Sequence, residues 1–241
     1  MNNLNLAKLA FKEIFWPNRC CICDRAGDIL CQACYNNLEF IDINRACKRC
    51  GGAYGKDICT ECNDVMLGSL GLDEFPLITL RHALIANEDS QKIITTYKDK
   101  GERCLCFHIA QIMSRYMDDE IDKNFCYLTY IPDTISAVKR RGFDHSQEIA
   151  DKLGEIANME VIRLFEPPKT ADQRKLTKHE RIQNMQGSLK INESCIYDRQ
   201  QQLLIIDDIC TTGSTMYAAA IQAKHAGLQS VYGLTFARVF E

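Results

Sequence analysis

The sequence contains no apolar run long enough to act as a secretory leader or to cross a membrane. Its first apolar stretch, Leu4 to Trp16, carries Lys8, Lys12 and Glu13, so we expect an amphipathic helix there. We therefore predict a cytoplasmic protein with no membrane span. Disulfides are rare in that reducing compartment, where cysteines are more often thiols or metal ligands.

The chain also lacks a marked excess of charge of either sign. It holds 29 Lys and Arg against 32 Asp and Glu, so binding to nucleic acid through bulk charge is not expected, although this balance is compatible with a local basic patch. No Gly-x-x-x-x-Gly-Lys-Ser/Thr motif occurs, which argues against a nucleoside triphosphatase. A length of 241 residues allows one sizeable core and a small second module.

Cysteine, in contrast, is abundant. Eight of the 14 cysteines form four Cys-x2-Cys pairs, in a stretch with too little apolar content for a core of its own. Two such pairs complete a closed zinc shell of four thiolates, which leaves no open position for a catalytic water. We predict two structural Zn²⁺ ions, whose removal should unfold this region because each contributes on the order of 10 kcal/mol. The predicted ligands are Cys20, Cys23, Cys31, Cys34, Cys47, Cys50, Cys59 and Cys62.

The order of the pairs favours two consecutive ribbons, with the first four ligands on one ion and the last four on the other. An interleaved cross-brace is the alternative, and Cys21 could exchange with a neighbour as ligand. Disulfides are disfavoured by the regular spacing and by the expected compartment. The remaining cysteines are expected to be small buried hydrophobic residues: Cys104, Cys106, Cys126, Cys195 and Cys210.

The remainder of the chain has the pattern of an α/β domain with a parallel sheet covered by helices, because short apolar runs alternate with helical periodicity. We divide the chain into residues 1–66, a helix with a double zinc ribbon, and residues 67–241, with the boundary inside Asn63 to Pro76. The predicted strands are Leu77–Leu84, Tyr127–Ile131, Glu160–Leu164, Leu203–Ile206 and Val231–Phe236. The predicted helices are Ser90–Tyr116, Asp144–Ala157 and Ser214–Ala226.

The segment 203–215 is the most informative part of this domain. Its strand ends on Asp207 and Asp208, at the edge where α/β sheets bind ligands and where two carboxylates can accept hydrogen bonds from adjacent ribose hydroxyls. The next turn offers hydroxyl donors and close backbone approach, and the helix behind it points its first amides at the same spot, as a phosphate requires. The turn residues are Thr211, Thr212, Gly213, Ser214 and Thr215. The alternative is an ordinary strand–turn–helix connection whose acids only cap the helix. Capping, however, requires fewer polar groups than the two acids and four hydroxyls of this segment.

A second ligand loop is expected after strand Tyr127–Ile131, because this loop lies at the same sheet edge. Its candidate residues are Asp133, Thr134, Lys139, Arg140 and Arg141. His145 either titrates beside this loop or only belongs to the cap of the next helix. The polar stretch Glu166 to Asn192 is long for a connection and is expected to form a mobile lid.

The segment 203–215 resembles the phosphoribosyl diphosphate (PRPP) motif of type I phosphoribosyltransferases, an apolar strand, two acids and a Thr-Thr-Gly-x-Thr turn. The resemblance implies that the two acids hold the ribose hydroxyls and that residues 211–215 cradle the 5′-phosphate. It also implies Mg²⁺ as a companion of PRPP, and a second loop that grips the pyrophosphate. The fold expected on this basis is a type I phosphoribosyltransferase-like parallel sheet.

The order of motifs along the chain resembles the ComF family, which pairs an N-terminal zinc ribbon with a phosphoribosyltransferase domain and is associated with natural transformation. The residues that carry it, besides segment 203–215, are Cys50-Gly51, Tyr97-Lys98-x-x-Gly101, Arg141-Gly142-Phe143, Gln173-x-x-Leu176 and Arg181-x-x-Asn184-x-x-Gly187. The chain departs from the family at Asp144-His145, where relatives read Asn-Gln, and at Ile131-Pro132-Asp133-Thr134, where theirs is more basic. The resemblance implies a role in DNA uptake, with DNA-uptake or recombination proteins docking on the ribbon.

Two functions from different classes follow. In the first, the chain binds PRPP with Mg²⁺; it is either a phosphoribosyltransferase, an enzyme of the glycosyltransferase class, whose acceptor no segment reveals, or a PRPP-binding domain without transfer. In the second, the ligand site is regulatory or vestigial and the chain is a non-catalytic factor that handles single-stranded DNA, across Lys139 to Arg141 and the basic part of the lid.

Overall fold

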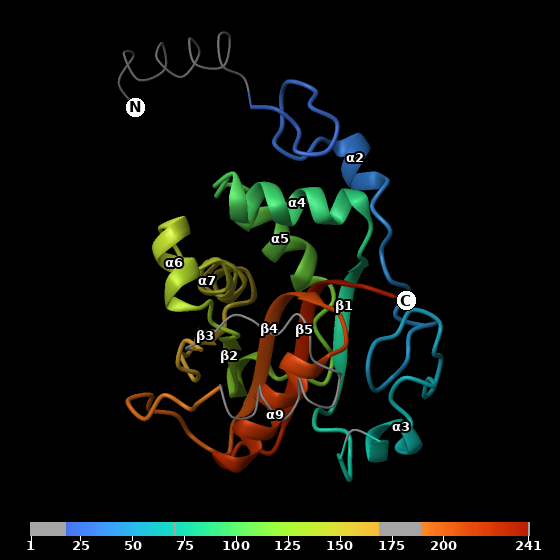
Figure 1. Ribbon diagram of the computed structural model, residues 1–241, viewed down its shortest axis with the longest axis vertical. Helices are drawn as coiled ribbons and strands as arrows, with labels where there is room; N and C mark the ends of the chain where they lie inside the picture. The colour runs from blue at the N-terminus through green and yellow to red at the C-terminus, as the bar shows by residue number, and fades with distance from the viewer. Residues whose placement is uncertain (1–17, 70, 169–188, 241) are drawn as a thin grey trace.

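A computed structural model describes residues 18–69, 71–168 and 189–240 (Figure 1). Its centre is a five-stranded sheet of order β1-β5-β4-β2-β3 in which every pair of neighbours is parallel. The strands are β1 (Leu80–Ile85), β2 (Cys126–Tyr130), β3 (Glu160–Val161), β4 (Gln202–Cys210) and β5 (Val231–Arg238). The main helices are α4 (Glu88–Asp99), α5 (Leu105–Ser114), α6 (Ile135–Arg141), α7 (His145–Ala157) and α9 (Ser214–His225).

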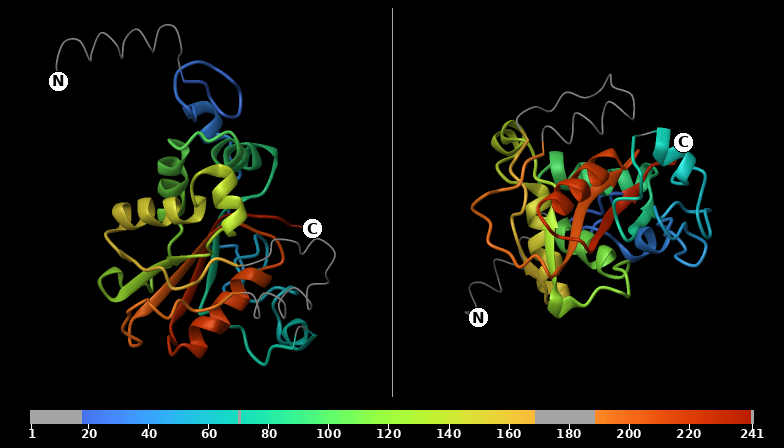
Figure 2. Two further views of the ribbon diagram at one scale, coloured as in Figure 1. Left: turned by 60° about the vertical axis from the view of Figure 1, so that its left-hand side comes forward. Right: turned by 90° about the horizontal axis from the view of Figure 1, so that it is seen from below.

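Helices cover both faces of the sheet, which explains why its central strands carry buried apolar residues on both faces. Successive residues of a strand point to opposite faces. Leu204 and Ile206 of β4 accordingly join the cluster formed with α4, α5 and α7, whereas Leu203 and Ile205 join the cluster on the α9 side. Figure 2 shows the sheet between these two layers. The predicted α/β class, with a parallel sheet flanked by helices, is confirmed.

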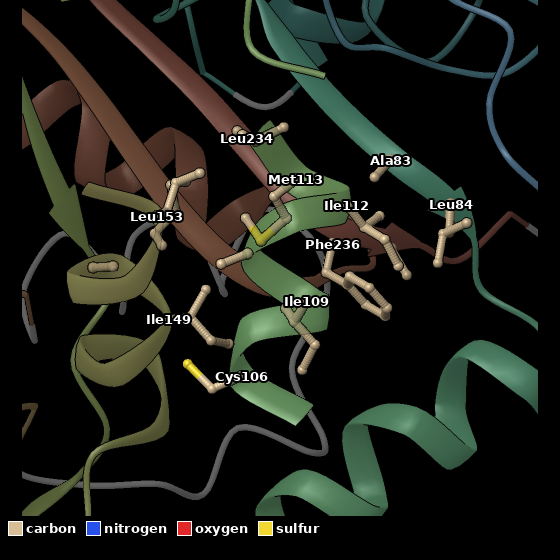
Figure 3. Close-up of a cluster of buried hydrophobic side chains, with 14 of the residues drawn as sticks. Ala83, Leu84, Cys106, Ile109, Ile112, Met113, Ile149, Leu153, Leu234 and Phe236 are labelled. Atoms are coloured by element: carbon tan, nitrogen blue, oxygen red, sulfur yellow. The ribbon is translucent and has the colours of Figure 1, made fainter. Parts of the chain in front are cut away.

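The larger core cluster lies between α5, α7 and the sheet. Figure 3 shows Ile109 and Met113 of α5 meeting Ile149 and Leu153 of α7 and Phe236 of β5. Each of these five side chains is at most 1% exposed. This packing fixes the beginning of α7, and with it the loop that precedes that helix, against the carboxyl edge of the sheet.

Several predicted boundaries are wrong. The expected helix Ser90–Tyr116 is two helices, because Gly101 adopts a positive φ of 73° between α4 and α5. The strand that was expected to end before the acid pair continues to Cys210. The predicted ligand loop contains α6, whose first turn is capped by the Thr134 side chain. The strand expected over Glu160–Leu164 is only two residues long.

The cysteine-rich region precedes the sheet and packs directly on it. It contains the short helix α2 (Gln32–Asn36) and is followed by α3 (Asp64–Ser69), inside the stretch expected to be a boundary. Leu67 of α3 and Phe75 are buried in the cluster on the α9 side. The division of the chain near residue 66 stays a prediction.

The predicted helix Leu4–Trp16 lies outside the described residues, as do residues 169–188 of the predicted lid with their ComF-like spacings. A last short element, η1 (Lys123–Phe125), leads into β2. Among the helices that the structure describes, none is long and apolar enough to cross a membrane.

Candidate ligand site and cysteine clusters

The eight predicted zinc ligands form two groups, and the pairing is consecutive. We call them the first cluster (Cys20, Cys23, Cys31, Cys34) and the second cluster (Cys47, Cys50, Cys59, Cys62). Within each, the four sulfur atoms lie within 4.8 Å of one another. The predicted consecutive arrangement is therefore confirmed over the interleaved one.

The sulfur distances fit tetrahedral zinc and not disulfides. Four thiolates about 2.3 Å from one Zn²⁺ ion lie about 3.8 Å apart, whereas a disulfide requires about 2.05 Å. The Sγ atoms of Cys23 and Cys31 are 3.8 Å apart, and those of Cys50 and Cys59 are 3.4 Å apart. None of the fourteen cysteines forms a disulfide. Both clusters thus have the donor set and the spacing of a structural zinc site.

Backbone geometry supports the same assignment. The amides of Cys31 and Cys59 point at the sulfur atoms of Cys20 and Cys47, at 3.5 and 3.4 Å. Cys21 lies outside the first cluster. Its position agrees with Cys21 as a bystander and not as a ligand.

The other cysteines only partly meet expectation. Cys106, Cys126 and Cys210 are buried, as predicted. Cys195 is half-buried. Cys104 is exposed, because it caps the start of α5 where the chain turns at the surface, so the prediction is wrong there.

The acid pair of the ligand site lies near the carboxyl end of β4, as expected, but Asp208 already has a cationic partner. Lys98, in the last turn of α4, forms an ion pair with the Asp208 carboxylate, whose side chain is 10% exposed. Burial would raise the pKa of Asp208, but Lys98 and His145 hold it well below its usual value. Burial and the neighbouring Asp208 charge raise the pKa of Asp207 to about 8. At neutral pH one acid of the pair is charged and the other is largely protonated.

His145 connects the two predicted loops. Its Nδ1 contacts the Asp133 carboxylate, while its Nε2 lies 3.9 Å from Asp208 Oδ2. The ring is buried, and the pKa of His145 is raised because hydrogen bonds to these two acids outweigh burial. The cap of α7 is Asp144, whose side chain accepts hydrogen bonds from two amides of the first turn. His145 therefore belongs to the site and not merely to a helix cap.

The predicted pyrophosphate residues divide into two groups. Arg141 turns inward, donates to Asp133 Oδ2 at 2.8 Å and is 14% exposed at its side chain. Lys139 and Arg140 are exposed in the last turn of α6, and neither has an ion pair within the described part of the chain. The Thr134 side chain accepts a hydrogen bond from the amide of Ala137 and so caps α6 instead of joining Asp133 and Arg141. The expected continuous basic run is thus split by the helix that carries it.

The turn 211–215 combines a left-handed glycine, neighbouring hydroxyl groups and the start of a helix. Gly213 adopts a φ of +78° immediately before α9, and the Thr212 and Ser214 hydroxyl oxygens are 2.7 Å apart. The twelve-residue helix α9 begins at Ser214, so its first amides and its dipole lie at this turn. These features match the arrangement that the sequence predicts for a phosphate.

Lys98 is the residue of the site that reasoning from the sequence missed. It appeared only inside the Tyr97-Lys98-x-x-Gly101 motif, which gave no role for it. The neighbouring Tyr97 is fully buried and donates to the backbone oxygen of His145 at 3.0 Å. The motif thus holds the end of α4 against the start of α7, and this contact aims Lys98 at Asp208.

Comparison with known proteins gives no assignment by sequence, because no family model and no curated protein matches the chain. Solved structures give distant matches. One is a hypoxanthine phosphoribosyltransferase from Staphylococcus aureus, 10% identical over 56% of this chain and 70% of that one, with a TM-score of 0.32. Another is an adenine phosphoribosyltransferase from Leishmania tarentolae, 9% identical over 59% of this chain and 74% of that one, with a TM-score of 0.35. At such scores the function has to be inferred from the residues of the site.

Proposed function

We propose that this chain binds PRPP together with Mg²⁺ at the carboxyl edge of its sheet. The observation that carries the proposal is the order of groups along β4 and into α9: two acids, of which Asp208 is buried, followed within three residues by a hydroxyl-rich turn at a helix N-terminus. A ribose phosphate has vicinal hydroxyls and a phosphate monoester at matching positions. Asp207 and Asp208 would hold the hydroxyls, and residues 211–215 the 5′-phosphate.

The charges around the acid pair suit a diphosphate. Lys98, Arg141 and His145 bring three cationic groups to this edge, each already paired with Asp133 or Asp208. A polyanion entering the site could exchange partners with them. Mg²⁺ binds carboxylate and phosphate oxygens. Because the cations already occupy Asp133 and Asp208, we expect Mg²⁺ to enter with the ligand and not alone.

The wider role is proposed from the family resemblance. Two zinc clusters followed by a ligand-binding α/β domain are compatible with a ComF-like protein that acts in natural transformation, with DNA-uptake or recombination proteins as partners of the ribbon. Transfer of the phosphoribosyl group would require an acceptor positioned at the anomeric carbon. The sequence and the described residues identify no acceptor site, so binding of PRPP is the part of the proposal to be tested first.

The first test is calorimetric titration of PRPP with Mg²⁺ into the zinc-loaded chain. We expect the double variant Asp207→Asn, Asp208→Asn to weaken binding at least about tenfold, because the charged Asp208 carboxylate supplies charge-assisted hydrogen bonds to the ribose and the Asp207 carboxyl supplies a further hydrogen bond. Asp119→Asn is the matched control, since this exposed acid precedes Glu120, which contacts the amino end of β4. Equal affinity in the wild type and the folded double variant would refute the assignment of the acid pair.

A second candidate function, binding of single-stranded DNA, is favoured by one observation. Lys139 and Arg140 project from α6 into solvent beside the ligand edge. We expect Lys139→Glu with Arg140→Glu to reduce affinity for a short single strand and to flatten its salt dependence, whereas Lys123→Glu, at the amino end of β2, should have little effect. Fluorescence anisotropy at several salt concentrations measures the affinity and its salt dependence for each variant. Affinity that does not change with salt would exclude this function.

A further inference from the structure

The second cysteine cluster belongs to the same buried core as Tyr217, the residue behind the turn 211–215. Three of its ligands, Cys47, Cys50 and Cys62, belong to the same buried cluster as Tyr217 of α9. Tyr217 is 3% exposed and packs edge-to-face on Phe75 at a centroid distance of 5.4 Å. In Figure 1 the segment that carries the second cluster lies beside β1, on the same side of the sheet as α3. A metal site and a predicted phosphate turn thus share one packed core.

Tyr217 connects that core to the turn itself. A Cβ atom on Gly213 would lie 2.9 Å from Cζ of Tyr217 and 3.2 Å from its hydroxyl oxygen, so the ring fills the space directly behind the turn. The amide of Tyr217 also donates to the Gly213 carbonyl at 2.8 Å. Any shift of Tyr217 would therefore move the turn, because close-packed interiors transmit displacement.

Arg238 fastens the second cluster to the end of the sheet. This last residue of β5 is 4% exposed, donates to the backbone oxygen of Cys50 and forms an ion pair with Glu61, next to the ligand Cys62. His82 of β1 contacts the same Cys50 oxygen at 2.9 Å.

Arg238 is also paired in register with Cys210, the residue immediately before the turn, and the amide that follows Arg238 donates to the Cys210 oxygen at 2.9 Å. Arg238 therefore contacts a predicted metal ligand through its guanidinium and the strand that leads into the turn through its backbone.

We propose that the second cluster, when it holds its metal ion, keeps the turn 211–215 in its binding shape, and that Arg238 is the positioning residue between them. A phosphate site depends on amides held to within about half an ångström. In this structure Tyr217 packs behind Gly213 of the turn, and Arg238 holds Cys210, the residue that precedes the turn. The first cluster differs: Cys20 and Cys34 pack on the opposite face, with α4 and α5. The significance of the turn for PRPP rests on the proposed function. The support of the turn by the second cluster through Arg238, which we call the brace, does not.

The test measures amide hydrogen exchange over residues 211–217 together with zinc content and the affinity for ribose 5-phosphate. We expect Arg238→Met to retain two zinc ions, to raise exchange in the turn about tenfold and to weaken ribose 5-phosphate binding by a similar factor, because a buried charged hydrogen-bond donor is lost. Arg238→Lys should restore part of both effects. Arg49→Met is the matched control, since Arg49 contacts the second cluster but pairs outward with Asp64.

The outcomes separate the brace from the function. Unchanged exchange in the turn, or an equal rise throughout the sheet or in Arg49→Met, would overturn the inference. Ribose 5-phosphate could fail to bind the wild type while exchange in the turn still responds to Arg238→Met. That result would refute the phosphate-binding function but would support the role of Arg238 in holding the turn. Should Arg238→Met not fold, Glu61→Gln removes only the half-exposed partner of Arg238 and should raise exchange about twofold.

Discussion

At the scale of single residues, the acids of the site are balanced by cations from three different elements. Asp208 pairs with Lys98 of α4, and Asp133 pairs with Arg141 of α6. His145 of α7 lies between the two acids. Removing one partner of such a buried pair leaves an uncompensated charge, which is why these residues should tolerate substitution poorly.

His145 gives a prediction about pH. Its pKa in the folded chain is raised above the ordinary value of 6.5, so the charged ring stabilises the fold fully below that value and this contribution is lost as pH rises through the folded pKa. Asp207, whose pKa is raised from 3.8 to about 8, changes stability in the same direction over that whole interval. We therefore expect the free energy of unfolding to fall as pH rises from about 4 to about 8, and to fall more steeply above the ordinary His value of 6.5, where His145 contributes as well.

NMR titration of the ring combined with urea unfolding at several pH values measures these effects. Asp133→Asn should lower the pKa of His145, because its carboxylate is the partner of Nδ1. It should also make stability less dependent on pH. A His145 pKa that stays the same in Asp133→Asn would contradict the ion pair.

At the scale of elements, the glycines decide where helices begin and end. Gly101 separates α4 from α5 with a positive φ, and Gly213 with a φ of +78° allows β4 to turn sharply into α9. Residues 98–103 around the first of these breaks contain no proline, and apolar residues resume at Cys104, seven positions or two helical turns after Tyr97. For that reason the sequence predicted one long helix where the structure has two.

Gly213 carries a prediction at this scale. Gly213→Ala should destabilise the fold by about 1–2 kcal/mol, since a side chain is strained at this φ and its Cβ would approach Tyr217 too closely. Gly68→Ala in α3 is the control: nothing lies within 4 Å of its Cβ position, and alanine favours a helix. Chemical denaturation compares the two. Equal stability of both variants would show that the turn is not constrained as described.

At the scale of the whole molecule, the two cysteine clusters are continuous with the main core. The first cluster shares buried contacts with α4, and the second shares them with α9. The sequence predicted that loss of zinc would unfold the cysteine-rich region. The packing extends this expectation to the sheet, because each cluster supports a helix that contributes to the ligand edge.

Removal of zinc is therefore expected to lower the stability of the sheet as well. Chelation should shift a single thermal transition of the full chain down by at least about 10 °C, because binding to the folded state alone stabilises that state, and added zinc should restore it. Scanning calorimetry with and without chelator measures the shift. A separate low-temperature transition, with the main midpoint unchanged, would mean that the clusters are independent of the sheet.

The sequence by itself determined the features that depend on local spacing. Cys-x2-Cys pairs place thiolates for a metal wherever they occur, and an apolar run followed by Asp207, Asp208 and a hydroxyl-rich turn defines a strand, a pair of acids and a helix start. These are properties of neighbouring residues, so no knowledge of the rest of the chain is required.

Only the tertiary structure decided which distant groups meet at the site. Lys98 reaches Asp208 because Tyr97 anchors α4 on α7, and Arg141 turns inward because Asp133 and His145 are buried beside it. The presence of the second cluster and Tyr217 in one buried core likewise depends on which face of the sheet that segment covers. Pairings between remote elements follow from the packing of helices on the sheet, and no local pattern in the sequence records them.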